Sequence, residues 1–475
     1  MKNKLFISAL LGILLYLPAK AEVKLSSLLS DHMVLKRNSV VSLWGEGEPN
    51  KKVRISPSWT KKTFSVLVDT NGKWIADIPT TEAGGPYSIS FEQGNRITIN
   101  DVLLGEVWLC SGQSNMEMPV KGFSSQPVEG SFDHILNADS EIPVRLFKME
   151  KRPSLLPSDS IFASWQTLSP QSVADFSAVG YFFAMQLYRS LHIPIGMIQS
   201  AWSASNIQTW ISEDYLKAIP SVDLTHLQKE NVNDISTVYH KGALLYNGMI
   251  HPLRNYAING VIWYQGESNT YNPEEYIQLS ASWMKNWREL FHTPELPFYI
   301  TQIAPFNTTR EALISWPQFR DAQWKIKSSD SHCEMILTSD IGHSTCIHPP
   351  KKKEVGERLA ASALANTYGV RGLPKSYPSI QKWEKKGNKY VIYFDAADSG
   401  LIPEFGRVEG LEFLTQSGEL MPANSFIPRS KNCIEVWNDS LTNPKEIRYL
   451  YKNFQEGNLK TTLGLPVAPF RVIIE

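Results

Sequence analysis

The sequence predicts an α/β protein with a doubly wound, parallel central sheet and a β-rich domain on either side of it. Its 475 residues are enough for about three domains at roughly 150 residues each. Between residues 102 and 370, short and nearly continuous apolar runs alternate with helical patterns, which is typical of strands covered on both faces. Residues 22–101 and 371–475 carry short strand patterns between polar turns, which is typical of β-sandwich-like domains. We therefore predict three domains with these boundaries, behind a leader at residues 1–21.

The leader has the parts of a signal peptide. Lys2 and Lys4 precede an apolar run over residues 5–17, and Ala19-Lys20-Ala21 supplies a small-x-small cleavage pattern. A membrane anchor is the weaker alternative, because the run is shorter than the roughly 20 residues that cross a bilayer. We predict cleavage before Glu22 and a secreted or periplasmic protein without a stable membrane anchor.

The charge balance argues against nucleic acid as a partner. The chain has 47 basic and 47 acidic side chains, so no basic excess attracts a polyanion. Four cysteines are too few for a disulfide-built scaffold at this length, and the sequence leaves their pairing and the oligomeric state open. No P-loop, GxGxxG, HExxH or GxSxG motif occurs, so neither a nucleotide site nor a zincin site is indicated. We expect no cofactor.

The first β domain is expected to pack around alternating strands. Trp44, Trp59 and Trp74 stand in this domain, where they either bind carbohydrate or complete the core. Because tryptophan is usually largely buried, we favour packing. The strands are expected at residues 33–35, 40–44, 53–55, 64–68, 74–78, 87–91 and 97–99.

The central domain is expected to alternate strands with helices. Ser177 is a suitable N-cap for a helix that carries apolar residues at four-residue spacing through Leu191. Further helices are expected at residues 276–290, 318–327 and 353–366. The strands are expected at residues 107–109, 193–200, 260–264, 297–303 and 334–340. Strands of the last domain are expected at residues 390–394, 411–414, 433–437 and 446–451.

Polar clusters follow several strands of the central sheet. Ser114 follows the first strand, residues 202–206 the second and residues 265–269 the third, while Asp340 ends the last and is trailed by His343. The carboxyl ends of parallel strands meet at one edge of the sheet, where such folds bind ligands. Any one of these clusters is as easily an ordinary turn. Together they supply the serine, histidine, amide and carboxylate groups that acyl transfer requires.

Ser114 is the candidate nucleophile, and His348 is the candidate base that removes its proton. The developing oxyanion needs hydrogen-bond donors, for which the main-chain amides of Ser114 and Ser203 and a side-chain amide from Gln265 or Asn269 are candidates.

Substrate contacts are expected from residues of the same clusters, with core packing as the alternative for the two aromatic ones: Gln113, Asn115, Trp202 and Tyr264. Cys346 with His343 and His348 also suggests a metal site, but no second ligand pair stands at a familiar spacing, so we predict none.

Three segments closely resemble the sialate O-acetylesterase family. They are Gly112-Gln-Ser-Asn-Met, Tyr246-Asn-Gly-Met-Ile-His-Pro-Leu and Trp263-Tyr-Gln-Gly-Glu-Ser-Asn. The resemblance implies a flavodoxin-like SGNH-hydrolase domain flanked by β domains, acting on an acetylated carbohydrate. It also implies the reaction: Ser114 attacks the ester carbonyl, His348 shuttles the proton, and water hydrolyses the acetyl-enzyme.

Two positions depart from the family pattern. Cys346 stands where the family has the aspartate of Asp-Ile-His-Pro, and Trp202-Ser-Ala-Ser stands where it has Trp-Gly-Gly-Thr. In serine proteases, replacing the acid by its amide costs about 10⁴ in rate, or roughly 5.5 kcal/mol of barrier. Cys346 itself, Asp340, Glu267 or a main-chain carbonyl are the groups available to orient the histidine.

These departures leave three alternatives: a Ser-His dyad enzyme, an enzyme with a relocated acid, and a weakened or non-catalytic sugar-binding homologue. The sequence does not decide among acetylated sialic acids, xylan and pectic sugars as substrates. Substrate specificity is expected in loops such as residues 120–139 and 307–315, which the shared motifs do not cover.

Overall fold

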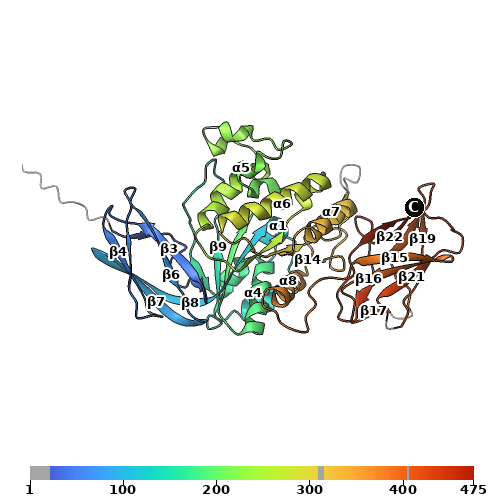
Figure 1. Cartoon of the computed structure of the whole chain (residues 1–475), viewed down its shortest axis with the longest axis horizontal. Helices are drawn as coiled ribbons and strands as arrows, with labels where there is room; N and C mark the ends of the chain where they lie inside the picture. Colours follow the sequence, from blue (N-terminus) through green and yellow to red (C-terminus); the bar gives the residue numbers. More distant parts are fainter. Residues whose placement is uncertain (1–21, 309–314, 404–405, 430, 475) are drawn as a thin grey trace, which may run out of the picture.

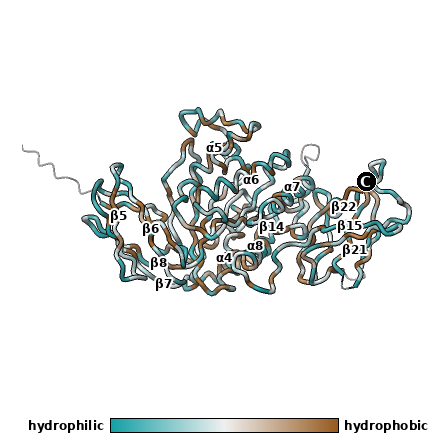
Figure 2. Tube along the Cα trace, in the orientation of Figure 1, coloured by the Kyte–Doolittle hydropathy of each residue, from teal (hydrophilic) through white to brown (hydrophobic). Residues whose placement is uncertain are grey.

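The computed structural model describes residues 22–308, 315–403, 406–429 and 431–474, so the expected signal peptide and residues 309–314 of one expected specificity loop lie outside the described residues. The chain forms three parts in a row: an N-terminal β part, a central α/β part and a C-terminal β part (Figure 1). Apolar segments concentrate in the inner strands and helices, and polar segments in the outer loops (Figure 2). No helix within these ranges is long and apolar enough to span a bilayer.

The N-terminal part contains two sheets, and every expected strand of this part is present. The expected alternation is visible in the strand over Lys73–Pro79, where Trp74 and Ile78 are buried and Ile75 between them is exposed. One sheet has the order β1 (Lys24–Leu25), β3 (Val40–Glu46) and β6 (Lys73–Pro79), and the other joins β4 (Lys52–Pro57), β5 (Phe64–Leu67), β7 (Gly84–Gln93), β2 (Val34–Lys36) and the beginning of β8 (Asn95–Gly112).

Strand β8 joins this part to the central sheet. It pairs antiparallel with β7 through Asn95–Leu104 and parallel with the central strands through Glu106–Gly112. The expected domain boundary between residues 101 and 102 therefore falls inside a continuous strand of 18 residues. The strand that ends beside Ser114 is thus anchored in two sheets.

The central sheet contains all five expected strands. Its order is β10 (Trp165–Thr167), β9 (Val144–Lys148), β11 (Ile195–Ala201), β8, β12 (Gly260–Tyr264), β13 (Phe298–Thr301) and β14 (Cys333–Ile336), with only β10 antiparallel to its neighbour. The five expected strands lie side by side in the order β11-β8-β12-β13-β14, and β9 and β10 extend the sheet beyond β11. The sequence did not predict β9 and β10, which are short and carry Arg145, Lys148 and Gln166 among apolar residues.

Helices cover both faces of this sheet, as in a doubly wound fold (Figure 1). Helices α4 (Ala178–Leu191) and α8 (Lys352–Asn366) lie on one face, and α6 (Pro273–Leu290) and α7 (Trp316–Ser328) on the other. All four expected helices are present, and the Ser177 hydroxyl caps α4 by accepting from the Gly180 amide at 3.0 Å. Gly356 lets α8 approach α4 closely, because a Cβ there would lie 2.6 Å from Phe182 Cβ. The short helices are α1 (Ser114–Glu117), α2 (Ser131–Leu136), α3 (Pro170–Asp175) and α5 (Glu213–Leu216).

The C-terminal part contains two antiparallel four-stranded sheets around their own apolar core, and the four expected strands are present. One sheet has the order β15 (Ile380–Lys386), β16 (Lys389–Phe394), β21 (Cys433–Trp437) and β20 (Asn424–Phe426). The other has the order β19 (Leu420–Pro422), β18 (Leu411–Leu414), β22 (Glu446–Tyr449) and β24 (Phe470–Ile473), and β17 (Leu401–Ile402) pairs with β23 (Lys460–Thr461).

Candidate active site

Ser114 lies at the carboxyl end of β8, in a turn that requires glycine before it. Gly112 has a φ of 137°, and a Cβ there would lie 2.2 Å from the carbonyl oxygen of Tyr264 on the neighbouring strand. The chain then turns into α1, so Ser114 is its first residue, and a first helical amide has no acceptor within its helix. The Ser114 side chain is therefore held at the sheet edge beside its own amide, which has no acceptor among the described residues.

The structure brings Ser114 and His348 together across 234 residues of sequence. Ser114 Oγ lies 2.7 Å from His348 Nε2, and His348 Nδ1 lies 2.6 Å from Gln126 Oε1. An amide oxygen only accepts hydrogen bonds, so the imidazole proton belongs on Nδ1. Nε2 is then the acceptor for the serine hydroxyl, which is the arrangement that general-base activation of serine needs.

The surroundings of His348 keep its ring neutral. Burial lowers the pKa of His348 to about 4, and the nearby positive charge of Lys352 acts in the same direction. No carboxylate is hydrogen-bonded to the ring among the described residues to oppose these effects. His348 is therefore ready to accept a proton at neutral pH, but the imidazolium that it forms is less stabilised than it is beside an acid.

Gln126 is held by a tight turn that the sequence did not single out. Phe123 and Gln126 exchange main-chain hydrogen bonds of 3.0 Å, and Gly122 begins the turn with a φ of 80°. A Cβ on Gly122 would lie 2.4 Å from the Gln126 carbonyl oxygen, so only glycine fits. The same turn packs the edge of the Phe123 ring against His348, with centroids 5.4 Å apart. Residues 122–126 therefore fix both the hydrogen bond and the orientation of the imidazole.

The acids expected to orient His348 have other partners. Both carboxylate oxygens of Asp340 are paired with Arg358, at 2.7 and 2.8 Å, and one also accepts from Lys460 at 2.9 Å. The Cys346 thiol donates to the His348 main-chain carbonyl at 3.2 Å and not to the ring. Asp340 thus joins the central part to the C-terminal part, which corrects the expectation for both residues.

Glu267 belongs to a buried network one residue away from Ser114. Asn115 donates to Glu267 Oε1 and, at 3.1 Å, to the carbonyl oxygen of Ile347, while Lys352 Nζ donates to Asn115 Oδ1 at 2.6 Å. Burial lowers the pKa of Lys352 to about 7 and raises the pKa of Glu267. Asn115 therefore ties the nucleophile turn to the segment that carries His348, and is not placed to contact substrate as the sequence suggested.

The expected oxyanion donor Ser203 is occupied by a carboxylate. Its amide and its hydroxyl both donate to Glu117 Oε2, the hydroxyl at 2.7 Å, and Glu117 also pairs with Lys151. Ala204 keeps a φ of 60°, the left-handed region that favours glycine, so the turn retains this conformation although alanine stands where the family has glycine. The Ser203 amide becomes available to an oxyanion only when Glu117 releases it.

Two expected side-chain donors point elsewhere. The Gln265 amide donates to the Ser205 carbonyl at 3.1 Å and to Asn269 Oδ1 at 2.8 Å. Asn269 in turn donates to Gln208 Oε1 at 3.0 Å. Because both side chains are buried in this network, we leave them out of the oxyanion site.

Of the remaining expected substrate contacts, only Trp202 is exposed enough to meet a ligand. It is half-buried, with Lys151 Nζ 5.4 Å from its ring centroid. Tyr264 is fully buried, and the Gln113 side chain accepts from the amides of Gly266 and Ser268 at 3.1 and 3.2 Å. Gln113 and Tyr264 thus have structural roles.

The described residues hold no cluster of three or more His, Cys, Asp and Glu side chains that fits a metal ion. The four cysteines, all within the described ranges, are free thiols, and only Cys346 is not fully buried.

A doubly wound α/β sheet with a serine and a histidine hydrogen-bonded at the carboxyl edge has the features of an ester hydrolase. Residues 104–365 match the family model described as carbohydrate esterase, sialic acid-specific acetylesterase. The chain belongs to this family, as the sequence motifs predicted.

Relatives extend the similarity beyond the central part. The chain is 28% identical to the sialate O-acetylesterase of Homo sapiens over 405 residues, which is 78% of this chain and 76% of the human protein. It is also 28% identical to that of Mus musculus over 417 residues, 76% of each chain. A solved carbohydrate acetylesterase from Xanthomonas citri is 31% identical, with a TM-score of 0.84, and the match covers 95% of this chain and 99% of the other.

Proposed function

We propose that this protein removes O-acetyl groups from carbohydrates with Ser114 as the nucleophile and a neutral Gln126 in the place of the usual acid. The observation that carries the proposal is the continuous chain of hydrogen bonds from Ser114 Oγ through the His348 ring to Gln126 Oε1. Family membership supports the substrate class, since the matched family consists of carbohydrate esterases.

In the proposed reaction, His348 Nε2 takes the hydroxyl proton as Ser114 Oγ attacks the acetyl carbonyl. The imidazolium then gives this proton to the departing sugar oxygen, which leaves an acetyl group on Ser114. Water attacks this ester with His348 again as the base, and acetate departs. Gln126 holds the ring with Nε2 toward the serine, and its amide dipole stabilises the imidazolium less than a carboxylate does.

The negative charge on the carbonyl oxygen needs donors at the same edge of the sheet. The free amide of Ser114 supplies one, and the Ser203 amide supplies a second when Glu117 moves away. Substrate binding next to Lys151 would favour this movement, because Lys151 is the ion-pair partner of Glu117 and lies over the half-buried Trp202.

Two finer assignments belong to the same proposal. The order 2-1-3-4-5 of the five expected strands, β11-β8-β12-β13-β14, and the position of Ser114 just after β8 support a flavodoxin-like SGNH-hydrolase fold for the central part. The basic and apolar leader with its small-x-small site supports export, cleavage before Glu22 and a secreted or periplasmic protein.

We propose acetylated sialic acids as the first substrates to test, because two relatives at 28% identity are named sialate O-acetylesterases. Acetylated xylan and pectin are the alternatives. The experiment is an acetate-release screen over all three substrates, with Ser114→Ala as the control. Release that requires Ser114 supports the proposal. Saturable glycan binding without any acetate release would contradict it and identify a non-catalytic homologue.

A further inference from the structure

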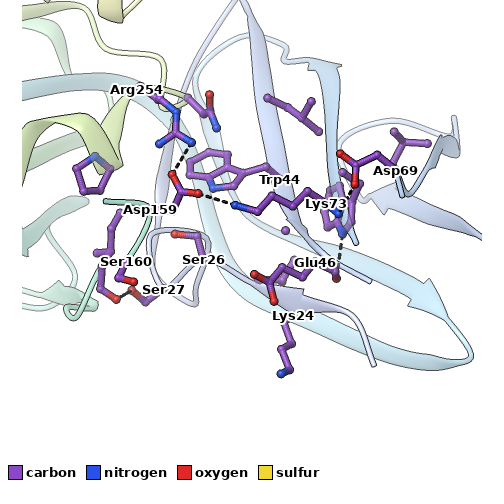
Figure 3. A pocket seen from close by; sticks show the side chains of 18 of the residues that line it. Lys24, Ser26, Ser27, Trp44, Glu46, Asp69, Lys73, Asp159, Ser160 and Arg254 are labelled. Carbon is purple, nitrogen blue, oxygen red and sulfur yellow. Dashed lines mark hydrogen bonds and ion pairs between the residues drawn. The ribbon is translucent and has the colours of Figure 1, made fainter. Parts of the chain in front are cut away.

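A cavity of about 600 Å³ lies between the N-terminal β part and the central part (Figure 3). Its walls come from strands β1, β3, β5 and β6 and from residues 159–162 and 252–255 of the central part. Pockets that bind small ligands have volumes of roughly 300–1,000 Å³ and often lie at domain interfaces. Neither Ser114 nor His348 lines it, so it is separate from the proposed active site.

Trp44 is the tryptophan of this region whose indole N–H is left for a ligand. Trp59 and Trp74 donate their indole N–H to the carbonyls of Pro79 and Glu46, each at 3.1 Å. Trp44 lines the cavity half-buried, and its N–H has no acceptor among the described residues. Its ring is fixed by an edge contact with Tyr256, at 6.4 Å between centroids. The cavity therefore presents an ordered aromatic ring with an unused donor.

Apolar side chains that are normally buried are exposed around this ring. Leu67, Ile75 and Phe162 are 57%, 51% and 47% exposed, and all three line the cavity. Exposed apolar groups that gather in one concave place mark a binding surface, whereas single ones do not. A ligand for this cavity should therefore have one apolar face.

The charged side chains around the cavity are balanced. Asp159 is held between Lys73, at 2.6 Å, and Arg254, at 2.7 Å (Figure 3). Within the described residues, the Lys24 and Glu46 side chains have no hydrogen-bond or ion-pair partner, so both are available to a ligand. With Asp69, the lining has three cationic and three anionic side chains, which gives no net attraction for an ion. These groups instead suit a neutral ligand that carries many hydroxyl groups.

We propose that this cavity is an accessory carbohydrate site that binds neutral sugar residues of a glycan away from Ser114. One face of a pyranose ring is apolar and would lie on Trp44 and the exposed aliphatic side chains. Its hydroxyl groups would accept from the indole N–H and exchange hydrogen bonds with Lys24 and Glu46. This site is a second activity of the chain, beyond ester hydrolysis.

The test is calorimetric titration of the full Ser114→Ala chain with xylotetraose, cellotetraose and lactose, and with N-acetylneuraminic acid as a charged comparison. We expect saturable binding of at least one neutral sugar. Trp44→Ala, added to this background, should weaken it by about tenfold or more, as loss of a central aromatic contact typically does. Glu46→Gln should weaken it less and keep the fold, because its carboxylate has no partner within the described residues.

Trp59→Ala is the matched control, because Trp59 belongs to the same part but does not line the cavity. In the Ser114 chain, Trp44→Ala should leave hydrolysis of a small activated acetyl ester unchanged. The proposal is overturned if no neutral sugar binds. It is also overturned if Trp44→Ala and Glu46→Gln both bind the sugar as tightly as the Ser114→Ala chain does. If the chain with Ser114 intact releases no acetate while sugar binding still depends on Trp44, the esterase proposal is refuted and the accessory site is kept.

Discussion

Nδ1 of His348 lies 2.6 Å from Oε1 of Gln126, so an uncharged amide takes the place that a carboxylate has in most serine hydrolases. Among the alternatives left open by the sequence, this geometry favours a Ser-His dyad with a neutral orienting residue. In serine proteases, replacing the acid by its amide costs about 10⁴ in rate, partly because the wrong tautomer forms. Here the amide presents its oxygen to the ring, which avoids that part of the cost.

Replacement of Gln126 should therefore affect turnover in opposite directions. Gln126→Leu leaves the Nδ1 proton unpaired at a cost of about 1–3 kcal/mol, so kcat/KM should fall about 5- to 150-fold. Gln126→Glu should raise both the pKa of His348 and kcat/KM, because a carboxylate stabilises the imidazolium that forms in the reaction. NMR titration of the imidazole and steady-state kinetics check the two effects. Equal activity in all three proteins would show that Gln126 does not orient the ring.

Cys346→Ala should change kcat/KM by no more than about twofold. Substitutions that remove no important contact usually change the free energy by about 0.5 kcal/mol or less. The reason is that the Cys346 thiol contacts the His348 main-chain carbonyl and not the imidazole. Kinetics with an activated acetyl ester measure this, with Gln126→Leu as the contrasting variant. A loss as large as that of Gln126→Leu would mean that the thiol takes part in catalysis.

The acid limb of the pH profile should report His348. Its pKa is lowered to about 4, so kcat/KM should be lost only as the pH falls through that value, where the base becomes protonated. The free energy of unfolding should also depend on the protonation of His348. In the unfolded chain its pKa returns to about 6.5, so between about pH 6.5 and 4 the unfolded state binds more protons, and stability falls as the pH falls. An acid limb near 6.5 in the kinetic profile would contradict the proposed burial of His348.

Glu117→Ala should increase kcat. Glu117 accepts the hydrogen bond of the Ser203 amide, and one oxyanion donor is typically worth about 10²–10³ in rate, so an increase of about tenfold or more is expected. Glu117→Gln keeps an acceptor without the charge, so its kcat should lie between those of the unsubstituted protein and Glu117→Ala. Single-turnover acetylation rates separate this effect from product release. A decrease in kcat for Glu117→Ala would instead assign the carboxylate a positive role.

The sequence predicted the elements that local patterns encode and missed the contacts that only the tertiary fold creates. Continuous apolar runs identified the five central strands, and the Ser177 cap identified the start of α4. Gln126 escaped notice because its partner is 222 residues away and only Gly122 hints at the turn that presents it. It does lie in the loop over residues 120–139 that was expected to set specificity.

Polar residues at strand ends were the other source of error. Asn115 and Gln265 have the residue types and positions of ligand-binding groups, yet both are buried and connect neighbouring segments. A side-chain amide can bind a ligand or connect neighbouring segments equally well. Which purpose it serves depends on whether the adjacent turns leave it facing solvent, and the sequence of one strand end does not contain that information.

Trapping of the acetyl-enzyme tests directly whether Ser114 is the nucleophile. The protein is mixed with an activated acetyl ester, quenched in acid before the first turnover is complete, and digested for mass spectrometry. We predict one acetyl group on the peptide that contains Ser114, a strongly reduced amount in His348→Ala, and none in Ser114→Ala. Acetate release by Ser114→Ala at the rate of the unsubstituted protein, or turnover without acetylated Ser114, would contradict the proposed mechanism.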